Sequence, residues 1–186
     1  MLTSPITVVL KNGKEVTLKS PLPVNASAVL TFVRQLFHES SENLNGPPAQ
    51  FDLISQKQEA EFLESLIGAP KDFMICAFYK KAVVGNLNLQ QIATPVSEHC
   101  GQFGIGVLNS FQNIGLGAAL LKQCIVEANR HGIWNLRMTV RTFNKPAIAL
   151  YEKLGFRRVG TLHAVAKIGE KYLDEYLYQR IEEGRS

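Results

Sequence analysis

The sequence has 186 residues, a mass of 20.6 kDa and a mean hydropathy of +0.00, with 46% hydrophobic and 19% charged residues. This composition excludes a disordered or collagen-like chain, and the length predicts a single domain over residues 1–186. The net charge of +4 comes from scattered basic residues, so we expect no nucleic-acid partner. No apolar run reaches the about 18 residues of a membrane span, so we expect no membrane partner.

The cysteines and the start of the chain bear on the compartment. Cys76, Cys100 and Cys124 are odd in number and far apart, and none belongs to a Cys-x-x-Cys pair. Neither a disulfide framework nor a cysteine-based zinc site is therefore expected. The first residues lack the basic start and the apolar run of a secretion signal. We expect a reduced, cytoplasmic protein without a metal.

Hydrophobic periodicity and turn signals predict alternating strands and helices. The pair Asn12-Gly13 predicts a hairpin between the first two strands. The expected strands cover residues 6–10, 15–18, 73–79, 82–89, 100–108, 136–140, 156–165 and 172–181. The expected helices begin near Asn25 and Ser55 and cover residues 115–130 and 144–154, and residues 40–48 should break the chain between the first two. This order indicates an α/β or α+β fold around a central sheet.

One glycine-rich stretch lies between a predicted strand and the longest predicted helix. It reads Gln112-Asn113-Ile114-Gly115-Leu116-Gly117-Ala118. Glycines let the backbone approach a ligand closely, and the start of a helix offers free N–H groups to a phosphate. A P-loop is excluded because no Gly-Lys-Ser/Thr follows, and a dinucleotide fingerprint is excluded because the third glycine is missing. Taken alone, the stretch fits a phosphate site and a plain strand-to-helix turn about equally.

A second pattern follows the next predicted strand, and the two together carry a resemblance. The chain resembles the GCN5-related N-acetyltransferases (the GNAT family), whose acetyl-CoA motif is Gln/Arg-x-x-Gly-x-Gly/Ala and whose second motif is Asn-x-x-Ala-x-x-x-Tyr-x-x-x-Gly-Phe. The matching residues are Gln112, Gly115 and Gly117, then Asn144, Ala147, Tyr151, Gly155 and Phe156. Within the family, the chain is most similar to the branch of ribosomal-protein-alanine and polyamine acetyltransferases.

The resemblance implies a mixed central sheet of about seven strands, flanked by four helices, whose central strands splay to admit acetyl-CoA as cosubstrate. It implies that the pantetheine arm pairs with the backbone of Ile105, Gly106 and Val107, and that an N–H near Val107 steadies the oxyanion. The backbone groups expected at the pyrophosphate are those of Asn113, Ile114, Gly115, Leu116, Gly117 and Ala118, with Gln112 at the entrance of the loop. A side chain at position 117 is expected to intrude on the phosphate.

Two residues of the second motif have competing interpretations. Asn144 precedes Lys145-Pro146 as a helix N-cap would, while the family places this residue beside the coenzyme. Tyr151 fits a core position on a helix, while the motif makes it the general acid that protonates the departing thiolate.

No general base is assigned. The positions where relatives carry carboxylates hold Thr139 and Gln102, and Glu98 and His99 are as compatible with a solvated surface as with catalysis. The absence of a carboxylate base favours an acceptor with a low amine pKa, such as a peptide N-terminus.

The resemblance implies that the acceptor pocket is built partly by the first two helices and the loop between them. That loop brings Glu39 and Glu42, whose carboxylates are candidates for holding a cationic acceptor, but a solvated surface is the favoured interpretation. The acceptor is expected to be a small-molecule amine or a protein N-terminus, attacked directly without a covalent enzyme intermediate, and a homodimer stays among the expected assemblies. The alternative is a non-catalytic acetyl-CoA sensor of the same fold.

Overall fold

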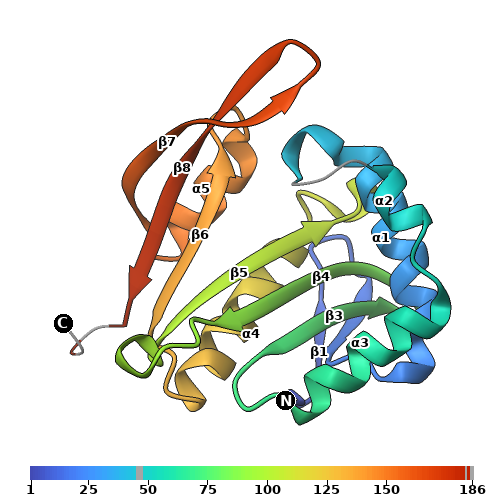
Figure 1. The fold of residues 1–186 in the computed structure, drawn as a ribbon. Helices are drawn as coiled ribbons and strands as arrows, with labels where there is room; N and C mark the ends of the chain where they lie inside the picture. Colours follow the sequence, from blue (N-terminus) through green and yellow to red (C-terminus); the bar gives the residue numbers. More distant parts are fainter. Residues whose placement is uncertain (45–47, 183, 185–186) are drawn as a thin grey trace.

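Eight strands join one sheet, in the order β1-β2-β3-β4-β5-β6-β8-β7 (Figure 1). This computed structural model describes residues 1–44, 48–182 and 184. The strands are β1 (Ile6–Val9), β2 (Glu15–Lys19), β3 (Phe73–Tyr79), β4 (Ala82–Gln91), β5 (Cys100–Val107), β6 (Asn135–Arg141), β7 (Arg157–Ile168) and β8 (Lys171–Ile181). The α-helices are α1 (Ala26–Ser40), α2 (Pro48–Asp52), α3 (Gln56–Gly68), α4 (Leu116–Arg130) and α5 (Lys145–Lys153).

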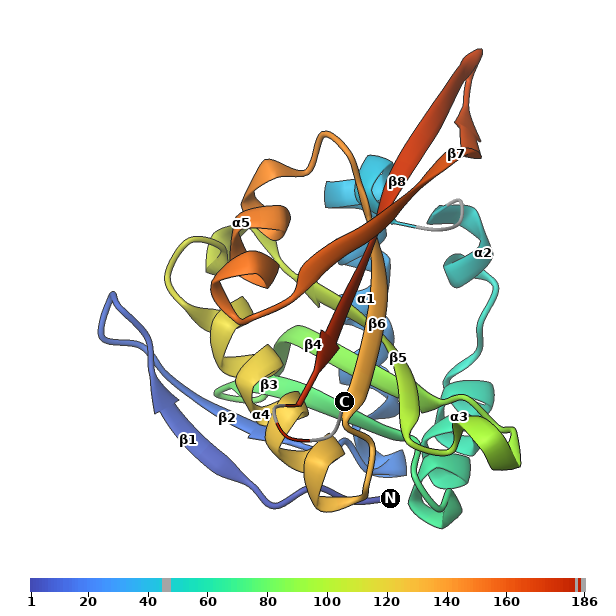
Figure 2. The ribbon, with the colours of Figure 1, turned by 90° about the vertical axis from the view of Figure 1, so that its left-hand side faces the viewer.

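The helices cover the two faces of the sheet unequally. Figure 2 places α4 and α5 on one side of the sheet, called here the back face, and α2 and α3 on the other, called here the front face. On the back face, α4 packs its apolar residues onto β3, β4, β5 and β6, and this is the larger core. On the front face, α1 and α3 pack onto β3 and β4 around Phe32, Leu63 and Phe78. The β6–β8–β7 part of the sheet has no helix drawn over its front face in either view.

The sheet forks between its central strands. β5 and β6 are the parallel pair, and they are in register at only three positions, Cys100 with Asn135, Gly101 with Leu136 and Gln102 with Arg137. By contrast, β5 pairs with β4 at seven positions, and β6 with β8 at seven. Beyond Gln102 the two halves of the sheet diverge, as Figure 1 shows. The expected splay of the central strands is thereby confirmed.

The element counts implied by the resemblance need correction. The described residues form eight strands rather than about seven, and five α-helices rather than four. The additional helix, α2, lies just after the segment predicted to break the chain, and Arg34 of α1 donates to carbonyl oxygens at its end. Residues 45–47, in the middle of that predicted break, lie outside the described residues.

Among the helices that the structure describes, none is both long and apolar enough to cross a membrane.

Candidate active site

The loop between β5 and α4 has two residues in the left-handed region. Asn113 has φ of 61° and Gly115 has φ of 97°. Asparagine tolerates this conformation and glycine adopts it without cost, so the sequence permits the turn that the loop makes. The turn lets α4 begin at Leu116, and Ala119 N–H donates its first helical bond to the Gly115 carbonyl at 3.0 Å.

The Gln112 side chain closes this loop. Its Nε2 donates to the carbonyl oxygen of Val107 at 3.1 Å and to Asn109 Oδ1 at 2.9 Å. Gln112 thus ties the end of β5 to the start of the turn. The first turn of α4 carries no acidic residue of its own, so none of its side chains neutralises the N–H groups and the positive end of the helix dipole.

Two glycines on either side of the loop, Gly106 in β5 and Gly117 in α4, lie where packing leaves little space for a side chain. A Cβ built on Gly117 would lie 3.2 Å from Leu150 Cδ2 on α5, so this residue is also where the two back-face helices meet. A Cβ on Gly106 would collide with Leu36 of α1. The expected intrusion on a phosphate is therefore not the only consequence of a side chain at position 117.

The β1–β2 hairpin supports the loop from a distant part of the sequence. Lys11 N–H donates to the Ile114 carbonyl at 3.1 Å, and the Lys14 ammonium lies 4.6 Å from the centre of the Phe111 ring. The Lys11 side chain also passes beside Gly115, within 4.0 Å of where a Cβ would lie. No local pattern signals this contact, because the two segments are about a hundred residues apart.

The fork exposes one edge of β5. Gly106 and Val107 pair with β4 on one side, while no described strand pairs with β5 beyond Gln102 on the other. Backbone groups along that edge are therefore open to a ligand that lies in the fork as an added strand would. Ile105, Gly106 and Val107 lie on this stretch, as the resemblance implies.

Tyr151 lies behind the fork on α5. Only 4% of its surface is exposed, and its ring contacts those of Phe103 and Phe156, with centroids 6.2 and 6.1 Å away. Burial raises the pKa of Tyr151 above its ordinary value, which keeps the phenol protonated. Its hydroxyl makes no hydrogen bond to any residue that the structure describes, and so stays available to a ligand.

Asn144 caps α5. Its Oδ1 accepts a hydrogen bond from the Ala147 N–H at 3.3 Å, which confirms the capping interpretation. The contact with the coenzyme stays a prediction.

Glu98 and His99 are poor candidates for the base. Glu98 pairs with Lys71 at 3.6 Å, and the His99 ring stacks on Trp134 with centroids 4.2 Å apart. Both residues precede β5 at the closed end of the fork. His99 comes four residues before Phe103, which is about 13 Å along an extended strand. Thr139 and Gln102 lie at the fork itself but carry no carboxylate.

The carboxylate of Glu39 is used within the protein. It accepts from Gln35 Nε2 at 2.7 Å and from the Asn109 N–H at 2.8 Å, and so joins the end of α1 to the loop between β5 and α4, which we call the cofactor loop after its expected ligand. Glu39 thus has a structural role, and its side chain is exposed, as the solvated interpretation expects. Glu42 is exposed, and its backbone carbonyl accepts from Arg141 Nε at 3.3 Å.

Arg141 and Glu175 form a buried ion pair that the sequence does not reveal. Their side chains are 3% and 9% exposed, and Arg141 Nη1 lies 2.5 Å from Glu175 Oε1. Arg141 also donates to the carbonyl of Leu44 at 3.4 Å. The pair therefore ties the end of β6 to the segment that follows α1, across the open end of the fork.

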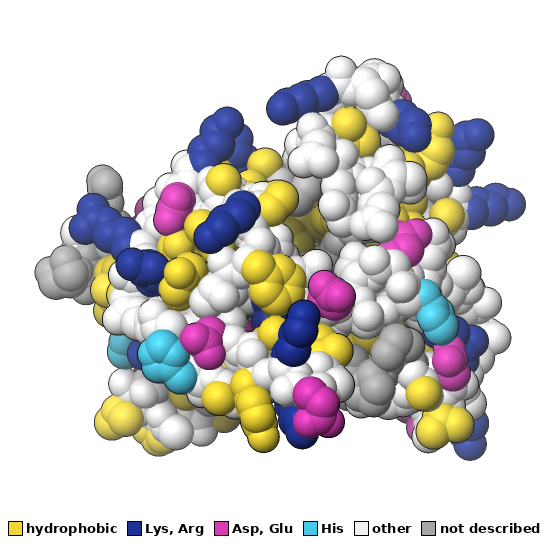
Figure 3. Space-filling view, turned by 90° about the horizontal axis from the view of Figure 1, so that it is seen from above, with side chains coloured by type: hydrophobic (Ala, Val, Ile, Leu, Met, Phe, Trp, Pro, Cys, Tyr) yellow, Lys and Arg dark blue, Asp and Glu magenta, His cyan; other side chains and the backbone are white. Residues whose placement is uncertain are grey.

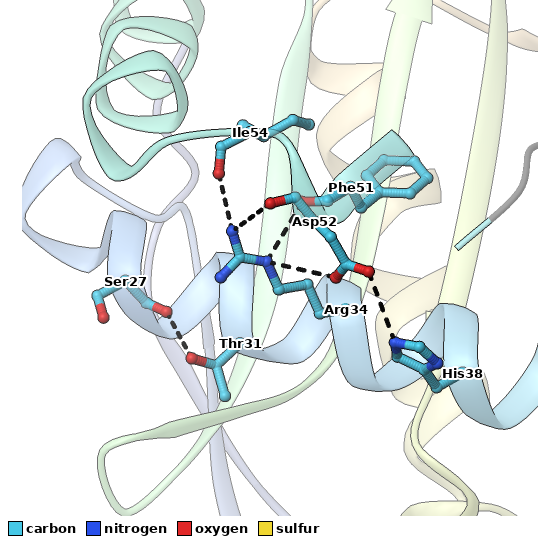
Figure 4. Close-up of polar contacts among 7 residues, drawn as sticks. All are labelled: Ser27, Thr31, Arg34, His38, Phe51, Asp52 and Ile54. Carbon is cyan, nitrogen blue, oxygen red and sulfur yellow. Dashed lines mark hydrogen bonds and ion pairs between the residues drawn. The ribbon is translucent and has the colours of Figure 1, made fainter. Parts of the chain in front are cut away.

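A second arginine, Arg34, binds the end of α2 and the residues that follow it (Figure 4). Arg34 donates to the carbonyl oxygens of Phe51 at 3.2 Å and Ile54 at 2.8 Å, and lies 3.9 Å from the Asp52 carboxylate. His38 Nε2 lies 3.9 Å from the other Asp52 oxygen. These contacts hold α2 against α1 at the entrance to the front face.

The surface seen from above carries charges of both signs. Figure 3 shows Lys and Arg side chains spread around this face, with Asp and Glu side chains between them.

Within residues 1–44, 48–182 and 184, no three His, Cys, Asp or Glu side chains are grouped so that they could share a metal ion.

The forked sheet, with a glycine turn opening the helix behind it, is the architecture of an acyltransferase, and comparison with known proteins agrees. Residues 32–156 match the acetyltransferase (GNAT) family model. The chain therefore belongs to the GCN5-related N-acetyltransferases, and by this membership it is an N-acetyltransferase. The resemblance stated from the two motifs is confirmed.

Individual relatives support this membership. L-amino acid N-acetyltransferase AaaT from Escherichia coli is 31% identical over 63% of this chain and 74% of its own length. The ribosomal protein bS18-alanine N-acetyltransferase from Escherichia coli is 40% identical over 39% of this chain and 49% of its own length, so this match spans about half of that protein. The acetyltransferase yncA from Salmonella typhimurium, solved with acetyl-CoA, has a TM-score of 0.77 at 17% identity over 92% of this chain and 96% of its own, which shows a common fold.

Proposed function

We propose that the protein transfers the acetyl group of acetyl-CoA to a primary amine, by direct attack, within a single domain. The observation that carries this proposal is the fork after the Gln102–Arg137 pair, which opens between the cofactor loop and Tyr151. Coenzyme A fits the fork because its pyrophosphate would meet the N–H groups at the start of α4 while its pantetheine arm pairs with the free edge of β5.

Each residue at the fork has a role in the proposed reaction. The amine nitrogen attacks the thioester carbon, a C–N bond forms, and an N–H near Val107 stabilises the oxyanion. The C–S bond then breaks, and Tyr151 donates its proton to the departing sulfur. The surplus proton of the amine leaves to water, and the phenolate regains a proton from solvent.

The acceptor class follows from the missing base. An amine of pKa about 10.4 needs roughly 4–5 kcal/mol to be neutral at pH 7, whereas an α-amine of pKa about 7.7–8.0 needs about 1 kcal/mol. Thr139 and Gln102 at the fork supply no carboxylate to lower this cost. The α-amino group of an amino acid or of a peptide N-terminus is therefore favoured over a polyamine.

The second candidate is a non-catalytic acetyl-CoA sensor. The absence of a carboxylate at Thr139 and Gln102 favours it, since these two positions then supply no base at the fork. Glu175, a buried carboxylate near the open end of the fork, is paired with Arg141. The two candidates differ in turnover and not in cofactor binding.

The test combines calorimetry with coenzyme A and thiol release from acetyl-CoA over a panel of peptides, amino acids and polyamines. Binding together with amine-dependent thiol release supports the enzyme. Binding without release for any amine supports the sensor, and no binding overturns both.

A further inference from the structure

Arg137 has no carboxylate partner within the described part of the chain. Its Nη2 lies 3.4 Å from the Cys100 sulfur, and its Nε is buried without a hydrogen-bond partner. Buried guanidinium nitrogens are normally satisfied, so an under-partnered one at an active site indicates a place for an anion. Arg141, further along the same strand, does have a carboxylate partner in Glu175.

The face on which Arg137 lies follows from strand alternation. Leu136 and Met138 belong to the core under α4 on the back face. Arg141, an even number of residues further along β6, reaches the carbonyls after α1 on the front face. Because side chains alternate along a strand, Arg137 projects to the front face too, where no helix is drawn over β6 (Figure 1).

Arg137 and Tyr151 lie at nearly the same position along the strands of the fork. Arg137 and Gln102 form the last parallel pair before the strands separate. Tyr151 packs against Phe103, one residue beyond Gln102, and against Tyr178, which is opposite Met138. The acid on the back face and the arginine on the front face are thus about one residue apart along the strands, or roughly 3.3 Å.

The front face beside Arg137 is open to solvent at Gly104. Gly104 of β5 is exposed and carries no side chain, and Thr139 is the next front-face residue of β6. An acceptor there would approach a thioester in the fork from the side opposite Tyr151.

We propose that Arg137 binds a carboxylate of the acceptor, and that the enzyme therefore acts on free α-amino acids in preference to peptide N-termini or plain amines. This inference rests on the proposed acetyl transfer. In an α-amino acid a single carbon separates the amine from the carboxylate, which matches the short separation between Arg137 and the fork. A planar guanidinium recognises a carboxylate through paired, charge-assisted hydrogen bonds.

The test compares each of several L-amino acids with its own carboxamide, as acceptors for the wild-type protein and for Arg137→Met. We expect the wild-type kcat/KM to favour the acid by about tenfold or more, and the variant to lose that preference. The amine pKa of the carboxamide is lower than that of the acid, and this difference affects the rates of both proteins alike. The measured quantity is therefore the ratio of kcat/KM for the acid to kcat/KM for the amide, compared between the wild type and Arg137→Met. Activity of Arg137→Met on the amide reports that the variant is folded.

Two further variants sharpen the test. Arg137→Lys keeps a point charge but not the fork geometry, and should restore part of the preference. Arg158→Met removes an exposed arginine that stacks on Tyr176 of β8, and should leave the ratio unchanged. Equal use of acids and amides by the wild type, or an unchanged ratio in Arg137→Met, would overturn the inference while leaving acetyl transfer intact. Thiol release with no amine at all would overturn the proposed function, and the inference with it.

Discussion

The two sides of the fork are built by different means. On the cofactor side, the side-chain contacts that close the loop are local, as between Gln112 and Val107, five residues apart, and the distant β1–β2 hairpin adds a backbone bond from Lys11 to Ile114. On the acceptor side, the contacts join distant segments. Glu39 meets Asn109 across 70 residues, and Arg141 meets Glu42 across 99. The cofactor side offers mostly backbone, and the acceptor side offers side chains.

Because of this difference, acceptor choice can vary while cofactor binding is kept. Backbone N–H groups at a helix start bind a diphosphate whatever the neighbouring side chains are, provided that the turn can form. Side chains such as Arg137 bind one chemical group and set acceptor choice. A chain can therefore keep its cofactor while the acceptor changes, and each prediction below perturbs one side and asks whether the other responds.

The largest effect is expected from Arg141→Met. This change leaves the Glu175 carboxylate buried without its cation, and should lower the free energy of unfolding by about 3–5 kcal/mol in urea denaturation. The double variant Arg141→Met/Glu175→Leu should recover most of that loss. A single variant as stable as the wild type would show that the pair does not hold the acceptor side together.

Tyr151→Phe should reduce kcat by about 100-fold without weakening coenzyme A binding. Stability should change by less than about 0.5 kcal/mol, because the hydroxyl bonds no described residue. Since burial raises the pKa of Tyr151, the acid stays protonated as pH rises, and wild-type kcat should show no loss of this acid below about pH 10.

Tyr178→Phe is the matched control for Tyr151. Its hydroxyl donates to Glu152 Oε1 at 2.8 Å, so its loss should cost about 1 kcal/mol of stability and leave kcat within a few fold. If Tyr151→Phe keeps full turnover, the general acid lies elsewhere.

The cofactor side could be predicted from the sequence because its determinants are local. The Asn12-Gly13 turn and the loop with Gly115 each specify a backbone shape within a few residues. The forked sheet followed from the resemblance, which rests on that loop and on the motif around Tyr151.

The acceptor side could not be predicted in the same way. Nothing near Arg141 in the sequence indicates Glu175, and Glu39 reads as a solvated carboxylate until its hydrogen bond with the Asn109 N–H is seen. The count of helices failed for a related reason. α2 is only five residues long, and Arg34 of α1 binds the carbonyl oxygens at its end.

Substitutions at Gly115 in the loop and Gly117 in α4 distinguish the effect of backbone conformation from the effect of side-chain volume. Gly115→Ala places a side chain at φ of 97° and should weaken coenzyme A binding by about tenfold in calorimetry. Gly117→Ala should weaken it similarly, but its Cβ also presses on Leu150. The double variant Gly117→Ala/Leu150→Ala relieves that pressure. Restored affinity in it would assign the effect of Gly117→Ala to helix packing and not to the phosphate.

The smallest effect is expected from Lys11→Ala, which tests whether the β1–β2 hairpin belongs to the cofactor side. The Lys11 side chain passes beside Gly115, so its ammonium should attract the coenzyme A phosphates, and its loss should raise the Kd about threefold at low salt and less at high salt. Lys19→Ala is the control, because that ammonium lies over the Phe78 ring, 4.8 Å from its centre. Equal effects of the two variants would mean that the hairpin acts only through net charge. A specific effect of Lys11 would show that the cofactor side, too, depends on one side chain brought from a distant segment.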